Sequence, residues 1–176
     1  MTNGWQLETR RLFLRRVTAD DTGLMLSVWN DPAFIEYVGD RGIRTEAEAI
    51  EELEAGAFRL YRTWSYGPYK MVRKEDAAQI GICGLFKREN LDDPDIGFAV
   101  LPDYCGQGYA AEAASAVVAH ARDDLHVRNL LAIVSPGNTA SIGLIEKLGL
   151  TFSGMITMPG DDEAIRLYEM RLEWNS

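Results

Sequence analysis

One stretch of the chain, from Asp95 to Ala113, constrains the fold more than any other. It reads Asp-Ile-Gly-Phe-Ala-Val-Leu-Pro-Asp-Tyr-Cys-Gly-Gln-Gly-Tyr-Ala-Ala-Glu-Ala. The pattern predicts a strand at Ile96–Leu101 and an alanine-rich helix at Gly108–Arg122, joined by a Gly106-Gln107-Gly108 turn. The first N–H groups of a helix have no partner inside it, and the macrodipole is positive at that end. The turn is therefore a candidate anion site, as phosphates commonly bind there.

A second block follows one helix and one strand later. It reads Asn138-Thr-Ala-Ser141-Ile-Gly-Leu-Ile-Glu-Lys147-Leu-Gly149 and predicts a helix at Thr139–Leu148, which Gly149 ends. The apolar run Leu130–Val134 predicts a short buried strand before it. Asn138 and Ser141 are polar residues at the start of this helix, so each is a candidate cap.

The rest of the chain completes an alternating pattern of strands and helices. A first strand is predicted near Leu7–Leu14, with alternation clearest at 11–16. Two helices follow, one at Thr18–Asn30 that Pro32 ends or kinks and one from the Thr45–Glu48 capping box to Tyr61. Further strands are predicted at Tyr69–Arg73 and Ile80–Phe86, and the last two, at Thr151–Met158 and Ile165–Trp174, pair across the Pro159–Asp162 turn. The order β-α-α-β-β-β-α-β-α-β-β predicts an α/β fold with a mixed central sheet flanked by helices. A chain of 176 residues without a linker suits a single domain over 1–176.

Together the two blocks resemble the GNAT superfamily of N-acetyltransferases, closest to its ribosomal-protein N-terminal acetyltransferase (RimJ/RimL) branch. The resemblance covers nearly the whole chain and implies the GNAT fold, acetyl-CoA at the Gly106–Ala110 turn and an amine as acetyl acceptor. The family pattern Gln/Arg-x-x-Gly-x-Gly/Ala is Cys105-Gly-Gln-Gly108-Tyr-Ala110 here, so its first position departs. That departure concerns one side chain and leaves the backbone groups of the turn in place.

The resemblance also implies which residues contact the cofactor. They are Phe98, Ala99, Val100 and Leu101 on a strand end that splays from its neighbour, Cys105, Gly106, Gln107, Gly108, Tyr109 and Ala110 in the turn, and Asn138 and Ser141 near the CoA sulfur. Many family members use a Tyr two residues before the Lys of the second helix as proton donor, and Ile145 occupies that position here. Ser141 is the remaining candidate donor, with a helix cap as the alternative.

The general base is less determined. Asp95 and Glu36 are candidates, although the position of Asp95 at the start of a strand favours an exposed edge residue. In the family, the segment between the first helices commonly lines the acceptor pocket, which points to Phe34, Glu36 and Tyr37, with Trp64 as a further apolar wall. His120 and His126 are expected on the surface or at the end of their helix, where they would complement its dipole.

Charge and cysteine content limit the partners. A formal charge of −9 and a pI of about 4.7 argue against a nucleic-acid binder and would favour cationic molecules, including protonated amines. No apolar run suits a signal peptide or a membrane span. Cys83 and Cys105 form no metal-ligand spacing, so we expect no metal and a reduced, cytoplasmic setting.

Three functions remain open on these grounds. The first is an acetyl-CoA-dependent N-acetyltransferase whose acceptor is a protein N-terminus, an amino acid, a polyamine or an amine-bearing drug. The second is a non-catalytic acyl-CoA-binding module, which the changes at Cys105 and Ile145 favour. The third is an α/β domain with neither cofactor nor catalysis. The exposed ends of such a sheet could also pair two subunits as a homodimer.

Overall fold

The structure is a computed structural model that describes residues 4–174. Its strands are β1 (Gln6–Glu8), β2 (Leu12–Arg16), β3 (Pro68–Arg73), β4 (Gln79–Phe86), β5 (Asp95–Val100), β6 (Asn129–Val134), β7 (Thr151–Thr157) and β8 (Ala164–Arg171). Its helices are α1 (Thr22–Trp29), α2 (Pro32–Tyr37), α3 (Glu46–Leu53), α4 (Arg59–Trp64), α5 (Tyr109–Asp123) and α6 (Thr139–Lys147). The predicted domain limits at 1 and 176 lie outside the described residues.

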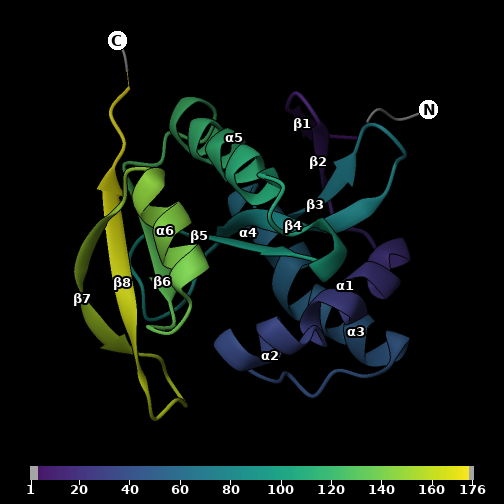
Figure 1. Cartoon of the computed structure of the whole chain (residues 1–176), viewed down its shortest axis with the longest axis horizontal. Helices are drawn as coiled ribbons and strands as arrows, with labels where there is room; N and C mark the ends of the chain where they lie inside the picture. Colours follow the sequence, from purple (N-terminus) through teal and green to yellow (C-terminus); the bar gives the residue numbers. More distant parts are fainter. Residues whose placement is uncertain (1–3, 175–176) are drawn as a thin grey trace.

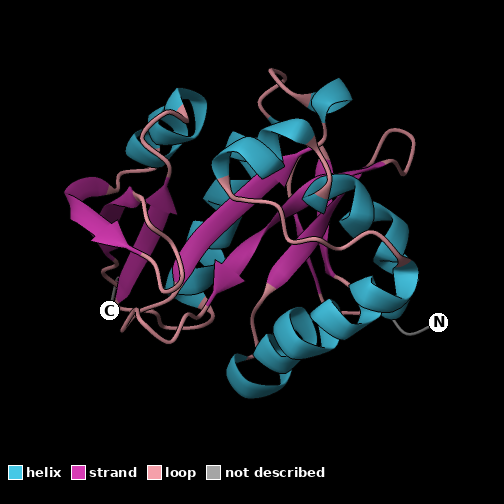
Figure 2. Cartoon of the chain, turned by 90° about the horizontal axis from the view of Figure 1, so that it is seen from below, coloured by secondary structure: helices cyan, strands magenta, loops and turns pink. Residues whose placement is uncertain are grey.

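The strands form one mixed sheet in the order β1-β2-β3-β4-β5-β6-β8-β7. Every neighbouring pair is antiparallel except β5 and β6. Helices cover both faces, with α5 and α6 on one side and α1 to α4 on the other (Figures 1 and 2). The predicted α/β class and mixed sheet are confirmed, as is the pairing of the last two strands.

Near the N-terminus the structure has a further strand and further helices beyond those in the predicted order. The first strand is a hairpin of β1 and β2, because Thr9 forms a turn in which its N–H donates to the Leu12 carbonyl and its hydroxyl accepts from the Leu12 N–H. Pro32 does end the first helix, yet it also begins α2 at the first helical position, with Asp31 as N-cap. Proline suits that position because its missing N–H would have no helical partner.

The helix predicted from Thr45 is longer than expected and irregular. The Thr45–Glu48 capping box is formed, since each side chain accepts a hydrogen bond from the other residue's backbone. A π-helical turn at Glu54–Phe58 separates α3 from α4, and the helical backbone continues to Trp64. Such turns change which side chains face a neighbouring layer and are frequent at functional sites.

Two apolar clusters hold the helices against the sheet. In one, the small residues Ala113, Ala114 and Ala121 of α5 are fully buried, which lets that helix lie close to β4 and β5. In the other, α1 and α3 pack through Met25, Val28 and Leu53 against the opposite face, and other members include Trp29 and Ile82. The start of α5 is thereby fixed relative to the end of β5, which matters for the site.

Candidate functional site

The turn between β5 and α5 keeps its first helical N–H groups available. Gly106 and Gly108 have φ of +73° and +81°, a left-handed conformation that disfavours side chains. Gly108 is the N-cap of α5 and supplies no side-chain cap, so the first amides of the helix stay free for another acceptor. The predicted turn residues Cys105, Gly106, Gln107 and Gly108 are exposed, Ala110 is half-buried, and Tyr109 is buried.

Arg11 supports this turn, and the sequence analysis did not identify it. Its guanidinium donates to the Gln107 carbonyl at 3.0 Å, pairs with Glu112 of α5 at 3.4 Å, and lies 4.2 Å from the centre of the Tyr109 ring. Arg11 precedes β2 and is 96 residues from Gln107 in sequence. Alternation around the strand gave no sign of this contact, because it depends on packing of the hairpin beside α5.

The strands β5 and β6 part immediately after they meet. Their parallel pairing is limited to Asp95 with Leu131, whereas β4 pairs with β5 as far as Val100. Beyond Asp95, the edge of β5 toward β6 therefore has no strand partner among residues 4–174. Peptide groups on such an edge can pair with another extended chain, such as the amide-bearing arm of CoA.

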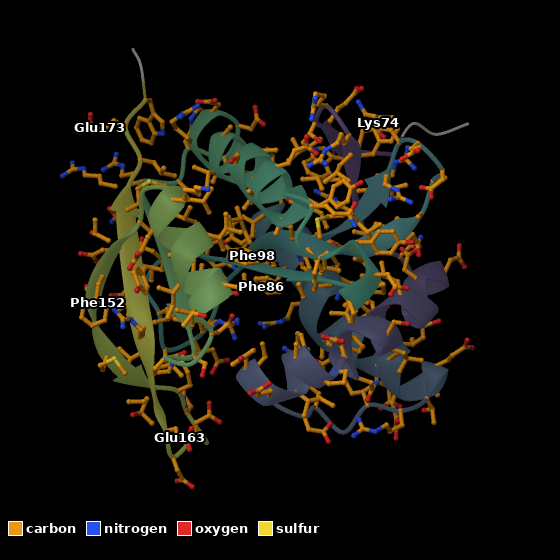
Figure 3. The ribbon with its side chains drawn as sticks, viewed as in Figure 1. Lys74, Phe86, Phe98, Phe152, Glu163 and Glu173 are labelled. Atoms are coloured by element: carbon orange, nitrogen blue, oxygen red, sulfur yellow. The ribbon has the colours of Figure 1, made fainter. Side chains whose placement is uncertain are left out.

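A pocket of about 500 Å³ opens beside this parting. Phe98 and Ala99 line it, together with Asn138, Ser141 and Ile145 of α6. Phe86 and Phe98 lie between α6 and the α1–α3 layer in Figure 3. Val100 and Leu101, which we also expected at the cofactor, are half-buried and lie outside this lining.

Asn138 and Ser141, the two polar residues at the start of α6, have different roles. The Asn138 side chain accepts from the Ser141 N–H at 3.3 Å and is the N-cap, so Asn138 performs the capping. Ser141 lies one turn into the helix, where its half-buried side chain lines the pocket. Ile145 is 2% exposed and offers no hydroxyl.

Asp95 is buried, and the expectation that it is an exposed edge residue was wrong. Its side chain is 1% exposed and accepts from Arg88 Nε at 3.0 Å. It is enclosed because β5 lies in the middle of the sheet, between β4 and β6. Burial raises the pKa of the Asp95 carboxyl, and the Arg88 guanidinium partly opposes that rise. Asp95 also lines the pocket that contains Ser141.

The segment before the long helix supplies the opposite wall of the pocket through Phe34 and Tyr37. Both line the pocket, and Tyr37 lies close to Gly137 before α6. Glu36 is exposed and outside the lining, because it points from the other side of α2. Trp64 is 47% exposed, stacks on Tyr66 and is likewise outside the lining, so its predicted role as a wall was wrong.

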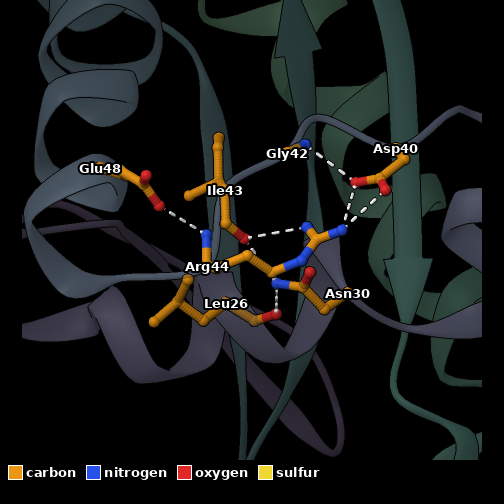
Figure 4. Close-up of polar contacts among 7 residues, drawn as sticks. All are labelled: Leu26, Asn30, Asp40, Gly42, Ile43, Arg44 and Glu48. Carbon is orange, nitrogen blue, oxygen red and sulfur yellow. Dashed lines mark hydrogen bonds and ion pairs between the residues drawn. The ribbon is translucent and has the colours of Figure 1, made fainter.

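The loop between α2 and α3 is held by polar contacts that fix this wall (Figure 4). Asn30 donates to the carbonyls of Leu26 and Ile43, both at 2.9 Å. Arg44 pairs with Asp40 at 2.7 Å. Arg41, in the same loop, lines the pocket and pairs with Glu52 of α3 at 2.6 Å.

The histidines and cysteines lie apart from the pocket lining. His120 lies in the last turn of α5, which was one of its two expected places, but it is 5% exposed and so not on the surface, which was the other. Its Nδ1 is 2.6 Å from Asp124 Oδ2, and Trp5 and Tyr69 pack on its ring. His126 is exposed, as expected. Both cysteines are free thiols, Cys83 buried and Cys105 exposed. Among residues 4–174, no group of three or more His, Cys, Asp or Glu side chains is placed to hold a metal ion.

Comparisons with known proteins assign the family. Residues 11–151 match the family model of the acetyltransferase (GNAT) domain, and the chain belongs to this family. It is 26% identical over 152 residues to the uncharacterized N-acetyltransferase p20 of Bacillus licheniformis, covering 85% of this chain and 84% of the relative.

Solved structures agree in fold. An acetyltransferase from Agrobacterium tumefaciens superposes with a TM-score of 0.80 at 23% identity, covering 97% of this chain and 96% of that one. RimL, a ribosomal L7/L12 acetyltransferase solved in complex with CoA, gives 0.81 at 15% identity, covering 96% and 98%. The resemblance to the GNAT superfamily is confirmed. No helix within the described residues is long and apolar enough to cross a bilayer.

Proposed function

We propose that this GNAT-family protein is an acetyl-CoA-dependent N-acetyltransferase that acetylates a primary amine by direct attack in a ternary complex. The observation that carries the proposal is the parting of β5 and β6 after Asp95, beside a pocket of about 500 Å³. One end of the parted strand leads to the open N-terminus of α5, and the pocket holds Ser141 and Asp95. The CoA-bound RimL structure shares this fold.

In this proposal some residues of the chain bind the acetyl donor and others transfer protons. The amides of Gly106–Ala110 bind the pyrophosphate, and the free edge of β5 from Phe98 to Leu101 binds the pantetheine arm. A backbone N–H of β5 stabilises the developing oxyanion. Asn138, which caps α6, holds Ser141 facing the sulfur.

Proton transfer is assigned to Asp95 and Ser141. An α-amine with a pKa of about 8 needs less help to lose its proton than a lysine amine at about 10.4. Burial raises the pKa of Asp95 toward the range in which a carboxylate is an effective base. The nitrogen attacks the thioester carbonyl carbon, and the C–S bond breaks. Ser141, directly or through water, gives a proton to the departing thiolate and regains one from the acetylated nitrogen, after which the amide and free CoA leave.

The first test is thiol release from acetyl-CoA with short peptides, amino acids, polyamines and aminoglycosides, beside CoA binding by calorimetry. Acceptor-dependent release is the expected result. Tight CoA binding with release at the background rate for every amine would instead support the acyl-CoA-binding module. Ile145 favours that alternative, because a buried isoleucine stands where many family members have the tyrosine proton donor.

A further inference from the structure

The ratio of cationic to anionic side chains in the pocket lining differs from that of the whole chain. The lining has four cations, Arg41, Arg59, Lys87 and Arg88, and three carboxylates, Glu52, Asp95 and Asp161. The whole chain has a formal charge of −9. The acidity of the surface therefore does not extend into the pocket, and a highly cationic ligand finds few partners there.

Most of these charges already have partners within the protein. Arg41 pairs with Glu52 at 2.6 Å, and Arg88 pairs with Asp95 at 3.0 Å. Lys87 Nζ donates to the carbonyls of Arg88 and Leu91. These three cations are committed to holding the loop before α3 and the end of β4.

Arg59 is different. Its Nε donates to the Ala55 carbonyl at 3.0 Å, and no carboxylate among the described residues pairs with its guanidinium. Arg59 follows the π-helical turn, and Gly56 and Ala57 of that turn line the pocket with it. A side-chain carbon added at Gly56 would meet no atom within 4 Å, so this part of the lining is open.

One lining carboxylate is also without a cation. Asp161, in the exposed turn between β7 and β8, pairs with no cationic side chain of the described residues. Among the described residues, Lys87 and Arg59 are the lining cations without a carboxylate partner, and Asp161 is the lining carboxylate without a cation. Lys87 Nζ already donates to two carbonyls, so the Arg59 guanidinium is the more available cation. A ligand that carries both an anion and an ammonium complements Arg59 and Asp161, whereas a polyamine adds cations to a lining with an unpaired guanidinium.

We propose that the acceptor is a small amine that also bears an anionic group, and that Arg59 binds this anion. A guanidinium presents a planar fork of donors that suits a carboxylate or a phosphate. Phe34, Trp29 and Phe98 line the same pocket, which suits an acceptor with an apolar body, such as an aromatic amino acid. The inference rests on the proposed N-acetyltransferase function and narrows its acceptor class.

The test compares acceptors that differ only in the anion. Thiol release from acetyl-CoA is measured with phenylalanine, phenylalaninamide and phenethylamine, with phosphoethanolamine and ethanolamine as the phosphate pair, and with spermidine. The amine of phenylalaninamide is less basic than that of phenylalanine, so more of it is unprotonated at neutral pH. If the protein does not recognise the anion, phenylalaninamide should therefore be the better acceptor of the two. We expect kcat/KM for one anionic acceptor to exceed that of its neutral partner by about 10- to 100-fold, as for a charge-assisted hydrogen bond.

Variants then assign the preference to Arg59. Arg59→Gln should bring the ratio of anionic to neutral acceptor close to one. Arg62→Gln is the matched control, because Arg62 lies on the same helix, pairs with Glu54 and is outside the pocket lining; it should keep the ratio. Melting curves of both variants check that each remains folded.

The outcomes separate this inference from the function on which it rests. Equal turnover of the anionic and neutral partners, a preference for spermidine, or an unchanged ratio in Arg59→Gln would overturn the anion site while leaving the transferase intact. Failure of every amine to release thiol, despite CoA binding, would overturn the transferase and the acceptor class with it.

Discussion

The Arg11 guanidinium donates to the Gln107 carbonyl at 3.0 Å and so links the N-terminal hairpin to the turn before α5. The same side chain reaches Glu112 and the Tyr109 ring. These contacts fix the Gln107 carbonyl in an exposed turn, which makes Arg11 a positioning residue for the proposed phosphate site.

Arg11→Gln should weaken acetyl-CoA binding by about 3- to 10-fold, because loss of one partly exposed charged hydrogen bond loosens the turn. Calorimetry with CoA measures the change in Kd. Arg10→Gln is the control, since Arg10 is exposed and adjacent in sequence, and it should bind CoA as the wild type does. Equal weakening by both variants would mean that general positive charge, and not the Gln107 contact, sets the affinity.

Ser141→Ala should lower kcat by about 100-fold while acetyl-CoA affinity stays within a factor of two or so, the pattern expected when a proton donor is lost. Stability should change little, because Asn138 and not Ser141 caps α6. Ser153→Ala, on the exposed face of β7, serves as the control. Unchanged turnover in Ser141→Ala would remove Ser141 from the mechanism.

The acid limb of the pH profile should report Asp95. Burial raises its folded-state pKa, so its carboxylate, and with it kcat/KM, should be lost at a higher pH than for an ordinary aspartate. Arg88→Gln removes a group that lowers this pKa, and the limb should therefore move to still higher pH. Profiles of kcat/KM for both proteins measure the shift; coincident acid limbs would exclude Asp95 as the titrating base.

Asp21→Asn should lower the free energy of unfolding by about 2 kcal/mol at pH 7, because it leaves Lys70 without its carboxylate in a mostly buried setting. Asp21 is 3% exposed, and Lys70 Nζ lies 2.7 Å from its Oδ1. Burial opposes ionisation of Asp21, but hydrogen bonds from Lys70 and Thr18 prevail, and its pKa lies below the ordinary 3.8.

The pKa of Asp21 is lower in the folded protein than in the unfolded chain. The stabilisation that its carboxylate gives is therefore complete at pH values above the unfolded-state pKa and is lost as the pH falls through the folded-state pKa. The difference between wild type and Asp21→Asn in urea unfolding should therefore shrink as the pH is lowered below about 4. Asp20→Asn, at the neighbouring exposed position, should have little effect at either pH. A difference that is constant with pH would show that the carboxylate charge is not what stabilises this site.

The local sequence determined the elements around the cofactor turn. Alternation, the alanine-rich run and the paired glycines predicted β5, the turn and α5, since each depends on neighbours within one or two turns of the chain. The same reasoning predicted the capping box at Thr45 and the last hairpin. It missed the hairpin at Thr9 and the helix at Pro32, where a single turn or capping residue redirects the backbone.

Only the tertiary structure decided which side chains meet. The contact of Arg11 with Gln107 joins residues 96 positions apart in sequence. The burial of Asp95 likewise depends on the strands that pack on either side of β5. Sheet order placed β5 between β4 and β6 and so enclosed Asp95. Periodicity and capping describe how a segment folds on itself, but the electrostatic setting of a charge depends on packing between segments, which no local pattern records.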